Sequence, residues 1–119
     1  MLIKREKLTS INNAIEKIKT KTNFTISTKY KILKIQDFLK KEFEIFYTLV
    51  QELQKKYNGT FDENGSIKFP EENMKLVNQE LFAFNQEEIS FPDIYFSLDE
   101  FEKEEFSWEE IEAIIMFIK

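Results

Sequence analysis

The feature that most constrains this chain is a stretch of thirty residues, from Thr28 to Tyr57, that contains neither glycine nor proline. Apolar side chains recur in it at spacings of three and four residues, which is the period of one face of an α-helix. At a rise of about 1.5 Å per residue, such a helix would span ~45 Å, more than the width of a small domain. We therefore predict one long helix, ended by Asn58-Gly59, with an end that projects from the domain or bends.

A shorter amphipathic helix is predicted before it, from about residue 4 to residue 20. Its apolar stripe consists of Leu8, Ile11, Ile15 and Ile18. The segment 22–28 is rich in Thr, Asn and Ser, whose side chains bond to nearby backbone groups and favour turns and helix caps. We expect a loop there, with Thr25 or Ser27 as the N-cap of the long helix.

A β-hairpin and a third helix are predicted after the long helix. Residues 60–69 favour a hairpin around Asn64-Gly65, the dipeptide that best fits a type I′ turn. Pro70 suits the first position of a helix, because proline has no N–H to leave unbonded there. The inner stripe of this helix would be Met74, Val77, Leu81 and Phe84.

Short elements are predicted for the C-terminal third. Ile89 and Phe91 alternate with polar residues, so we expect a short strand beside the hairpin. Capping boxes at Ser97-x-x-Glu100 and Ser107-x-x-Glu110 should each start a short helix. The last helix is expected to turn four side chains inward, namely Ile111, Ile114, Ile115 and Ile118.

Together these elements predict a single α+β domain over residues 1–119, mainly α. We expect a long antiparallel helical pair, a small β-hairpin or three-stranded sheet, and short C-terminal helices that close the core.

Common catalytic chemistry is excluded by composition, because the chain has no histidine and no cysteine. It lacks the usual general base near neutral pH and the side chains of nucleophilic triads and zinc sites. With two glycines it also has no phosphate-binding loop motif. Residues 60–71 match a calcium loop at four positions, but the hairpin accounts for the same residues without a metal. We expect no enzymatic activity, catalytic residue, metal or cofactor.

No apolar run approaches the ~20 residues of a membrane span, and no signal-peptide pattern follows the first residues. The absence of cysteine fits a reducing compartment. We therefore expect a cytoplasmic protein that makes no contact with a membrane.

Charge is divided sharply between the two halves of the chain. Residues 1–57 hold 13 Lys and Arg against 6 Asp and Glu, whereas residues 58–119 hold 4 against 16. The net charges are therefore +7 and −12, which sum to −5. Two interpretations are open: two faces of opposite potential, or a basic helical pair held by an acidic C-terminal half.

The acidic half contains a run of carboxylates interleaved with aromatic residues. In one interpretation this run is a solvated helical face whose aromatics turn into the core. In the other it docks on a basic partner, because complementary potential speeds encounter and aromatics supply hot-spot energy. The candidate partner-binding residues are Phe101, Glu104, Glu105, Phe106, Trp108, Glu109 and Glu112.

The lysines of the basic half offer an alternative site for nucleic acid, since clustered cations neutralise phosphates. The candidate residues are Lys17, Lys21, Lys29, Lys31 and Lys34. With one arginine in the chain there is little means of reading guanine, so such binding would be weak and blind to sequence. We do not expect direct nucleic-acid contact to be the main function.

Several segments together resemble a family of small phage and prophage proteins of low-GC bacteria. They are Lys55-Lys56-Tyr57 at the end of the long helix, Asp62-Glu63-Asn64-Gly65-Ser66, Pro70-Glu71-Glu72, the stretch Ile89 to Ile94, and Ser107-Trp108-Glu109-Glu110-Ile111. The resemblance spans most of the chain and implies a phage or prophage origin; it carries over no catalytic residues.

Three hypotheses of function follow. The first is a phage-encoded, non-enzymatic inhibitor that resembles anti-CRISPR proteins in size and acidity and binds a host protein, such as a CRISPR effector nuclease. The second is a phage assembly or virion accessory protein that acts through helix-mediated contacts with a phage protein or in a homo-oligomer. The third is a weak nucleic-acid binder.

Overall fold

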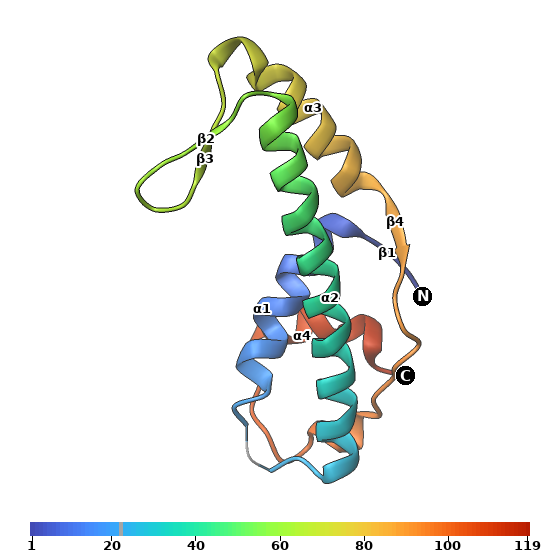
Figure 1. The fold of residues 1–119 in the computed structure, drawn as a ribbon. Helices are drawn as coiled ribbons and strands as arrows, with labels where there is room; N and C mark the ends of the chain where they lie inside the picture. The colour runs from blue at the N-terminus through green and yellow to red at the C-terminus, as the bar shows by residue number, and fades with distance from the viewer. Residues whose placement is uncertain (22) are drawn as a thin grey trace.

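The computed structural model describes residues 1–21 and 23–119 of the chain, and Figure 1 shows their arrangement. The elements in chain order are β1 (Leu2–Lys4), η1 (Arg5–Lys7), α1 (Leu8–Ile18), α2 (Ile26–Lys56), β2 (Thr60–Phe61), β3 (Ile67–Lys68), α3 (Glu71–Gln86), β4 (Glu88–Ser90), η2 (Leu98–Phe101), α4 (Trp108–Ile114) and η3 (Ile115–Phe117). The predicted α+β class, mainly α, is confirmed. Helix α2 runs antiparallel to α1 at one end and to α3 at the other (Figure 1).

The core lies at the N-terminal end of α2, where α1, α4 and the chain from 91 to 101 pack around it (Figure 1). The predicted stripe of α1 is confirmed, since Leu8, Ile11, Ile15 and Ile18 are all buried. Aromatic side chains fill the space between the helices, because their large apolar rings gain most from leaving water. The most deeply buried of them are Phe91, Phe96 and Phe117.

Helix α2 extends well beyond this core. Its buried residues are Thr28, Ile32, Ile35 and Leu39, and none of the α2 residues after Leu39, all of which the structure describes, is buried. The molecule measures 53 × 30 × 23 Å, with a radius of gyration of 17.5 Å. A compact domain of this length would have a radius of about 13–14 Å. The prediction that one end of the long helix projects is therefore confirmed.

Helix α3 folds back along the projecting end of α2, and the β2–β3 hairpin joins the two (Figure 1). We call residues 40–86 the arm. The predicted inner stripe of α3 is only partly correct. Val77 is buried, Leu81 and Phe84 are half-buried, and Met74 is exposed. The physical reason is that α3 packs against α2 and, at its end, against η1, which together cover only part of its apolar stripe.

Two separate two-stranded sheets replace the three-stranded sheet that we considered. The strand predicted around Ile89 forms as β4, but it pairs antiparallel with β1 instead of lying beside the hairpin. Ile3 lies opposite Ile89 in this pairing, and both side chains are buried. The first helix consequently begins later than predicted, because Lys4 belongs to β1 and a 3₁₀ turn precedes α1.

The hairpin forms where predicted, but its turn is not of type I′. Such a turn needs positive φ at both central residues. Among the described residues, however, Asn58 is the one non-glycine with positive φ, so Asn64 does not meet this condition. Gly65 has φ of 79° and its N–H donates to the Asp62 carbonyl at 3.1 Å. The connection is therefore a three-residue loop whose last residue is left-handed.

At the Asn58-Gly59 end of α2, Asn58 is the residue with the left-handed conformation, with φ of 56°. Gly59 is needed for a different reason. A Cβ added to it would lie 2.8 Å from Ile67 Cγ2 and 2.9 Å from Phe69 Cε1. The glycine thus lets β3 approach the end of α2 closely.

The predicted caps are confirmed at three helices. Thr25 accepts a hydrogen bond from the Thr28 N–H at the start of α2, and Ser107 accepts one from the Glu110 N–H at the start of α4. Ser97 and Glu100 form the capping box of η2. Pro70 was predicted at the first position of the helix, but it is the N-cap, and α3 begins one residue later, at Glu71.

The inward face of the last helix was predicted only in part. Ile114 is buried, and Ile111 and Ile118 are half-buried, but Ile115 is exposed. The α-helix ends at Ile114 and continues as the 3₁₀ helix η3, in which Phe117 takes the buried position. The tighter winding shifts the following side chains around the axis, so α-helical spacing does not identify the inward residue.

Candidate protein-binding site

Ion pairs join the basic and acidic halves of the chain. Lys31 Nζ lies 3.0 Å from Glu100, Lys21 Nζ lies 3.5 Å from Glu110, and Lys56 Nζ lies 3.1 Å from Glu80. The N-terminal ammonium and Arg5 make further pairs, with Asp93 and Glu87 respectively. Of the two interpretations of the charge asymmetry, the structure favours a basic helical pair held by acidic segments.

Among the carboxylates of these ion pairs, Glu100 accepts the most hydrogen bonds. It accepts hydrogen bonds from Thr28 Oγ1 at 2.8 Å, from Lys31 Nζ at 3.0 Å and from the Ser97 N–H at 2.8 Å. Burial by itself would raise the pKa of Glu100, but these hydrogen bonds lower it below its ordinary value. Glu100 therefore has a structural role.

Part of the predicted partner-binding set packs against the core. The Phe101 ring is buried and meets Phe24 edge to face at 5.8 Å and Phe106 at 5.1 Å. Lys21 Nζ lies 5.0 Å from the centre of the half-buried Phe106 ring. Glu104 accepts a hydrogen bond from the Asn23 N–H at 2.6 Å. These three predicted residues serve the fold in this structure.

The other four predicted residues are exposed to solvent. Trp108, the first residue of α4, is 81% exposed and is the most exposed of the chain's described aromatic side chains. Glu105, Glu109 and Glu112, which lie within four residues of Trp108 in the sequence, are exposed as well. We call these four residues the Trp108 surface.

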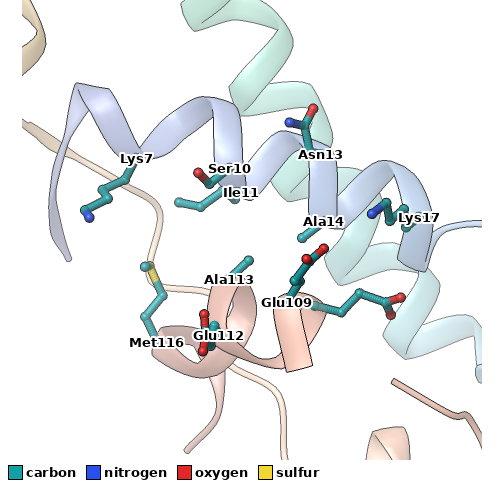
Figure 2. Close-up of a pocket in the computed structure, with 11 residues that line it drawn as sticks. Lys7, Ser10, Ile11, Asn13, Ala14, Lys17, Glu109, Glu112, Ala113 and Met116 are labelled. Carbon is teal, nitrogen blue, oxygen red and sulfur yellow. The ribbon is translucent and has the colours of Figure 1, made fainter. Parts of the chain in front are cut away.

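A groove between α1 and α4 adjoins this surface, and Figure 2 shows the residues that line it. Its volume is ≈ 500 Å³. One wall consists of Lys7 at the end of η1 and, from α1, Ser10, Ile11, Asn13, Ala14 and Lys17. The C-terminal segment contributes Glu109, Glu110, Glu112, Ala113 and Met116.

The two walls of the groove carry opposite charge, with lysines on η1 and α1 and carboxylates on α4 (Figure 2). Within the described chain, no ion pair joins Lys7 or Lys17 to Glu109 or Glu112. The structure thus brings Lys17, predicted for nucleic acid, next to two carboxylates predicted for a protein partner. Lys7 was not among the residues predicted from the sequence, and the structure places it at the end of η1, where it lines the same groove as Lys17.

The remaining predicted lysines do not form one cationic surface. Lys21 and Lys31 are paired with carboxylates, and Lys21 Nζ also donates to the Glu105 carbonyl at 2.5 Å. Lys34 Nζ lies 5.6 Å from the centre of the Tyr30 ring, and Lys29 is exposed. Since their potential is partly neutralised, the basis for phosphate binding is weaker than the sequence suggested.

The calcium-like segment has a backbone role. Asp62 Oδ1 accepts hydrogen bonds from the Asn64 and Ser66 N–H groups, both at 2.9 Å, and so closes the hairpin loop. Across residues 1–21 and 23–119, no group of three or more Asp or Glu side chains is placed to hold a metal ion. In the same residues, no helix combines the length and the apolar character that a membrane crossing requires.

Comparisons of the chain with models of protein families, with curated proteins and with solved structures found no match.

Proposed function

We propose that this protein is a non-enzymatic inhibitor of phage or prophage origin that acts in the host cytoplasm. It docks the Trp108 surface on a basic region of a host nucleic-acid-handling defence machine, such as a CRISPR effector nuclease. The observation that supports this proposal is the exposure of Trp108 beside three exposed carboxylates, while the neighbouring aromatics Phe101 and Phe106 are packed against the core.

An exposed tryptophan loses contact with water over a large apolar area when a partner covers it, about 150–250 Å² for a buried aromatic side chain. Such residues dominate the binding energy of many interfaces. The carboxylates Glu105, Glu109 and Glu112 would speed encounter with a basic channel and favour it over acidic surfaces. Among the residues that the structure describes, none forms an ion pair with these three carboxylates, so they are available to a partner.

The test is inhibition of DNA cleavage by a panel of purified CRISPR effector nucleases, with pull-down of each effector by the protein. We expect one effector to be bound and inhibited. Trp108→Ala should weaken that binding roughly 30-fold, the ratio that corresponds to a hot-spot loss of ~2 kcal/mol.

Tyr30→Ala is the matched control, because Tyr30 is an exposed aromatic residue on α2, outside the Trp108 surface. It should bind as the unmodified protein does. The proposal fails if no effector is retained above background, or if Trp108→Ala inhibits as strongly as the unmodified protein.

The second candidate function is an assembly or virion accessory protein that acts through helix-mediated contacts. The projecting arm favours it, because α3 has a single buried residue among those described, Val77. A helical hairpin with so little core offers apolar side chains to another protein.

A further inference from the structure

The arm has apolar side chains that nothing in the described chain covers. Between Lys40 and Lys56, α2 carries seven apolar or aromatic side chains and none is buried. Helix α3 adds Leu76 and Phe82, both exposed. Two helices that touch along a single line cannot enclose stripes of this width, so the arm lacks a core of its own.

Part of this uncovered surface lines two adjoining hollows on α2, of ≈ 280 Å³ and ≈ 270 Å³, which share Phe46, Leu49 and Phe84 and which we together call the groove. The first hollow lies between α2 and α3, and the second lies between α2, residues 5–9 and the end of α3, whereas Leu76 and Phe82 line neither. Leu49 is 39% exposed and Ile45 is 54% exposed along its α2 wall.

Two ion pairs lie beside this groove. Lys56 and Glu80 form an ion pair at the end near the hairpin. Beside the second hollow Arg5 stacks on Phe84, with its guanidinium carbon 3.9 Å from the ring centre, and pairs with Glu87. The groove is therefore an apolar strip flanked by these paired charges, with the carboxylates Glu42 and Glu52 also on its α2 wall.

We propose that the arm is a self-association surface, and that a second copy of this chain covers the groove with its own arm. The pairing of two helical hairpins through their apolar faces would form a four-helix bundle. In a symmetric dimer the same patch serves both copies, so the length and apolar character of the two surfaces match.

The size of the arm fits a dimer of modest affinity. A sixteen-residue helix such as α3 is roughly 24 Å long, and two helices side by side are roughly 20 Å wide. One face therefore offers roughly 500 Å², and two copies bury roughly 1,000 Å², which is near the lower limit for a specific interface. We expect dissociation in the micromolar range.

Charge also favours a second copy over the partners proposed for other surfaces. The arm, residues 40–86, holds six lysines and eight carboxylates, a net charge of −2. Residues 1–39 carry nine basic and three acidic residues, and residues 87–119 carry two and eleven. Nucleic acid or a basic channel would match those charged parts, whereas the nearly neutral arm matches a nearly neutral surface such as itself.

This inference deepens the second candidate function, that of helix-mediated contacts, and does not depend on the Trp108 surface. Size-exclusion chromatography with light scattering, from about 1 to 300 µM, tests it. The mass should rise with concentration from 14.4 kDa towards twice that value. A mass that stays at the monomer value throughout would overturn the proposal.

Leu49→Glu places a charge in the middle of the groove and should keep the protein monomeric at all these concentrations. Leu33→Glu is the matched control, because Leu33 is 60% exposed on the same helix outside the arm. It should dimerise normally. A dimer that is lost with Trp108→Ala or Leu33→Glu but survives Leu49→Glu would place the contact elsewhere.

Hydrogen exchange of the unmodified protein gives a second measurement that does not rely on any variant folding. Amides of α3 and of α2 beyond residue 40 should exchange more slowly at high concentration, whereas those of α1 should not change. The inhibitor assay separates this inference from the proposed function, because Leu49→Glu should still inhibit as a monomer. Concentration-independent exchange in the arm would count against the dimer alone.

Discussion

A single carboxylate, Glu100, illustrates how one residue can link segments that are distant in sequence. Its side chain bonds the Thr28 hydroxyl and Lys31 of α2 as well as its own helix start at Ser97. Thr28 is fully buried, and without the carboxylate its hydroxyl would keep only Thr25 Oγ1, at 3.2 Å, as a side-chain partner. The hydrogen bonds of a charged group are stronger than neutral ones, so their loss is costly.

We predict that Glu100→Ala lowers the free energy of unfolding by about 1.5–3 kcal/mol, the range for a lost hydrogen bond to a charged group. Urea denaturation followed by circular dichroism measures this loss. Glu102→Ala, two residues along the chain and exposed, is the control and should change stability little. Equal stability of the two variants would contradict the structural role of Glu100.

Glu100 also predicts how stability depends on pH. Its pKa is lowered in the folded protein from an ordinary value of 4.5, so the carboxylate stabilises the fold above that pH. This contribution is lost as the pH falls below 4.5 and through the lowered pKa of the folded state. Urea unfolding between pH 7 and pH 3 should show a smaller loss of stability for Glu100→Gln than for the unmodified protein. Parallel profiles for the two would refute this assignment.

Among the elements, the β2–β3 hairpin depends on two glycines for different reasons. Gly59 provides space, since an added Cβ would lie within 3 Å of Ile67 and Phe69 side-chain atoms. Gly65 provides backbone freedom, since its φ is 79° and no atom lies within 4 Å of an added Cβ. Overpacking and backbone strain are therefore separable within one hairpin.

We predict that Gly59→Ala destabilises the end of the arm by about 1–3 kcal/mol, because β3 must move away from the helix end. Gly65→Ala should cost about 1 kcal/mol through strain alone and leave β3 in place. Nuclear magnetic resonance distinguishes them: chemical shifts of Ile67 and Phe69 should move in the first variant and stay nearly unchanged in the second. The same shift pattern in both would show that space at Gly59 is not limiting.

The whole molecule consists of two parts. We call residues 1–39 and 87–119 the body, which contains the hydrophobic core, whereas the arm buries few side chains. The body buries whole stripes of α1 and the first half of α2, whereas the arm buries Val77 and Gly59 among the described residues (Figure 1). Local opening is easier where few apolar side chains are buried. The body and arm should therefore open independently.

We predict that, at concentrations of about 1 µM or below, amides in α3 exchange with solvent at least tenfold faster than those in the middle of α1, in line with the range of local opening energies. Hydrogen exchange with mass spectrometry measures this at peptide resolution. Comparable protection of the two helices in the dilute monomer would show that the arm is as stable as the body.

Much of the fold depends on local interactions, and these could be predicted from the sequence. Thr25, Ser97 and Ser107 bond to backbone groups three residues away, and the spacing of Leu8, Ile11, Ile15 and Ile18 repeats within one helix. Each of these signals lies in a short window of sequence, so no knowledge of the tertiary structure was needed. The long helix and its projection followed from the same periodicity and from length.

The candidate site could be predicted only in part, because partners distant in sequence decide which side chains remain exposed. Lys21 and Lys31 looked like free cations until Glu110 and Glu100 were placed against them. Phe101 belonged to the same acidic run as Trp108, but only Trp108 points away from the core.

The sequence by itself determined the caps of three helices, the buried stripe of α1 and which catalytic side chains the chain lacks. Only the tertiary structure decided that β1 pairs with β4, that the acidic segments neutralise the basic helices, and that the arm stands apart from the core. Capping and periodicity act over a few residues. Strand pairing, ion pairing and burial depend on contacts between residues as distant in sequence as Leu2 and Ser90, and a single sequence carries no local signal for such contacts.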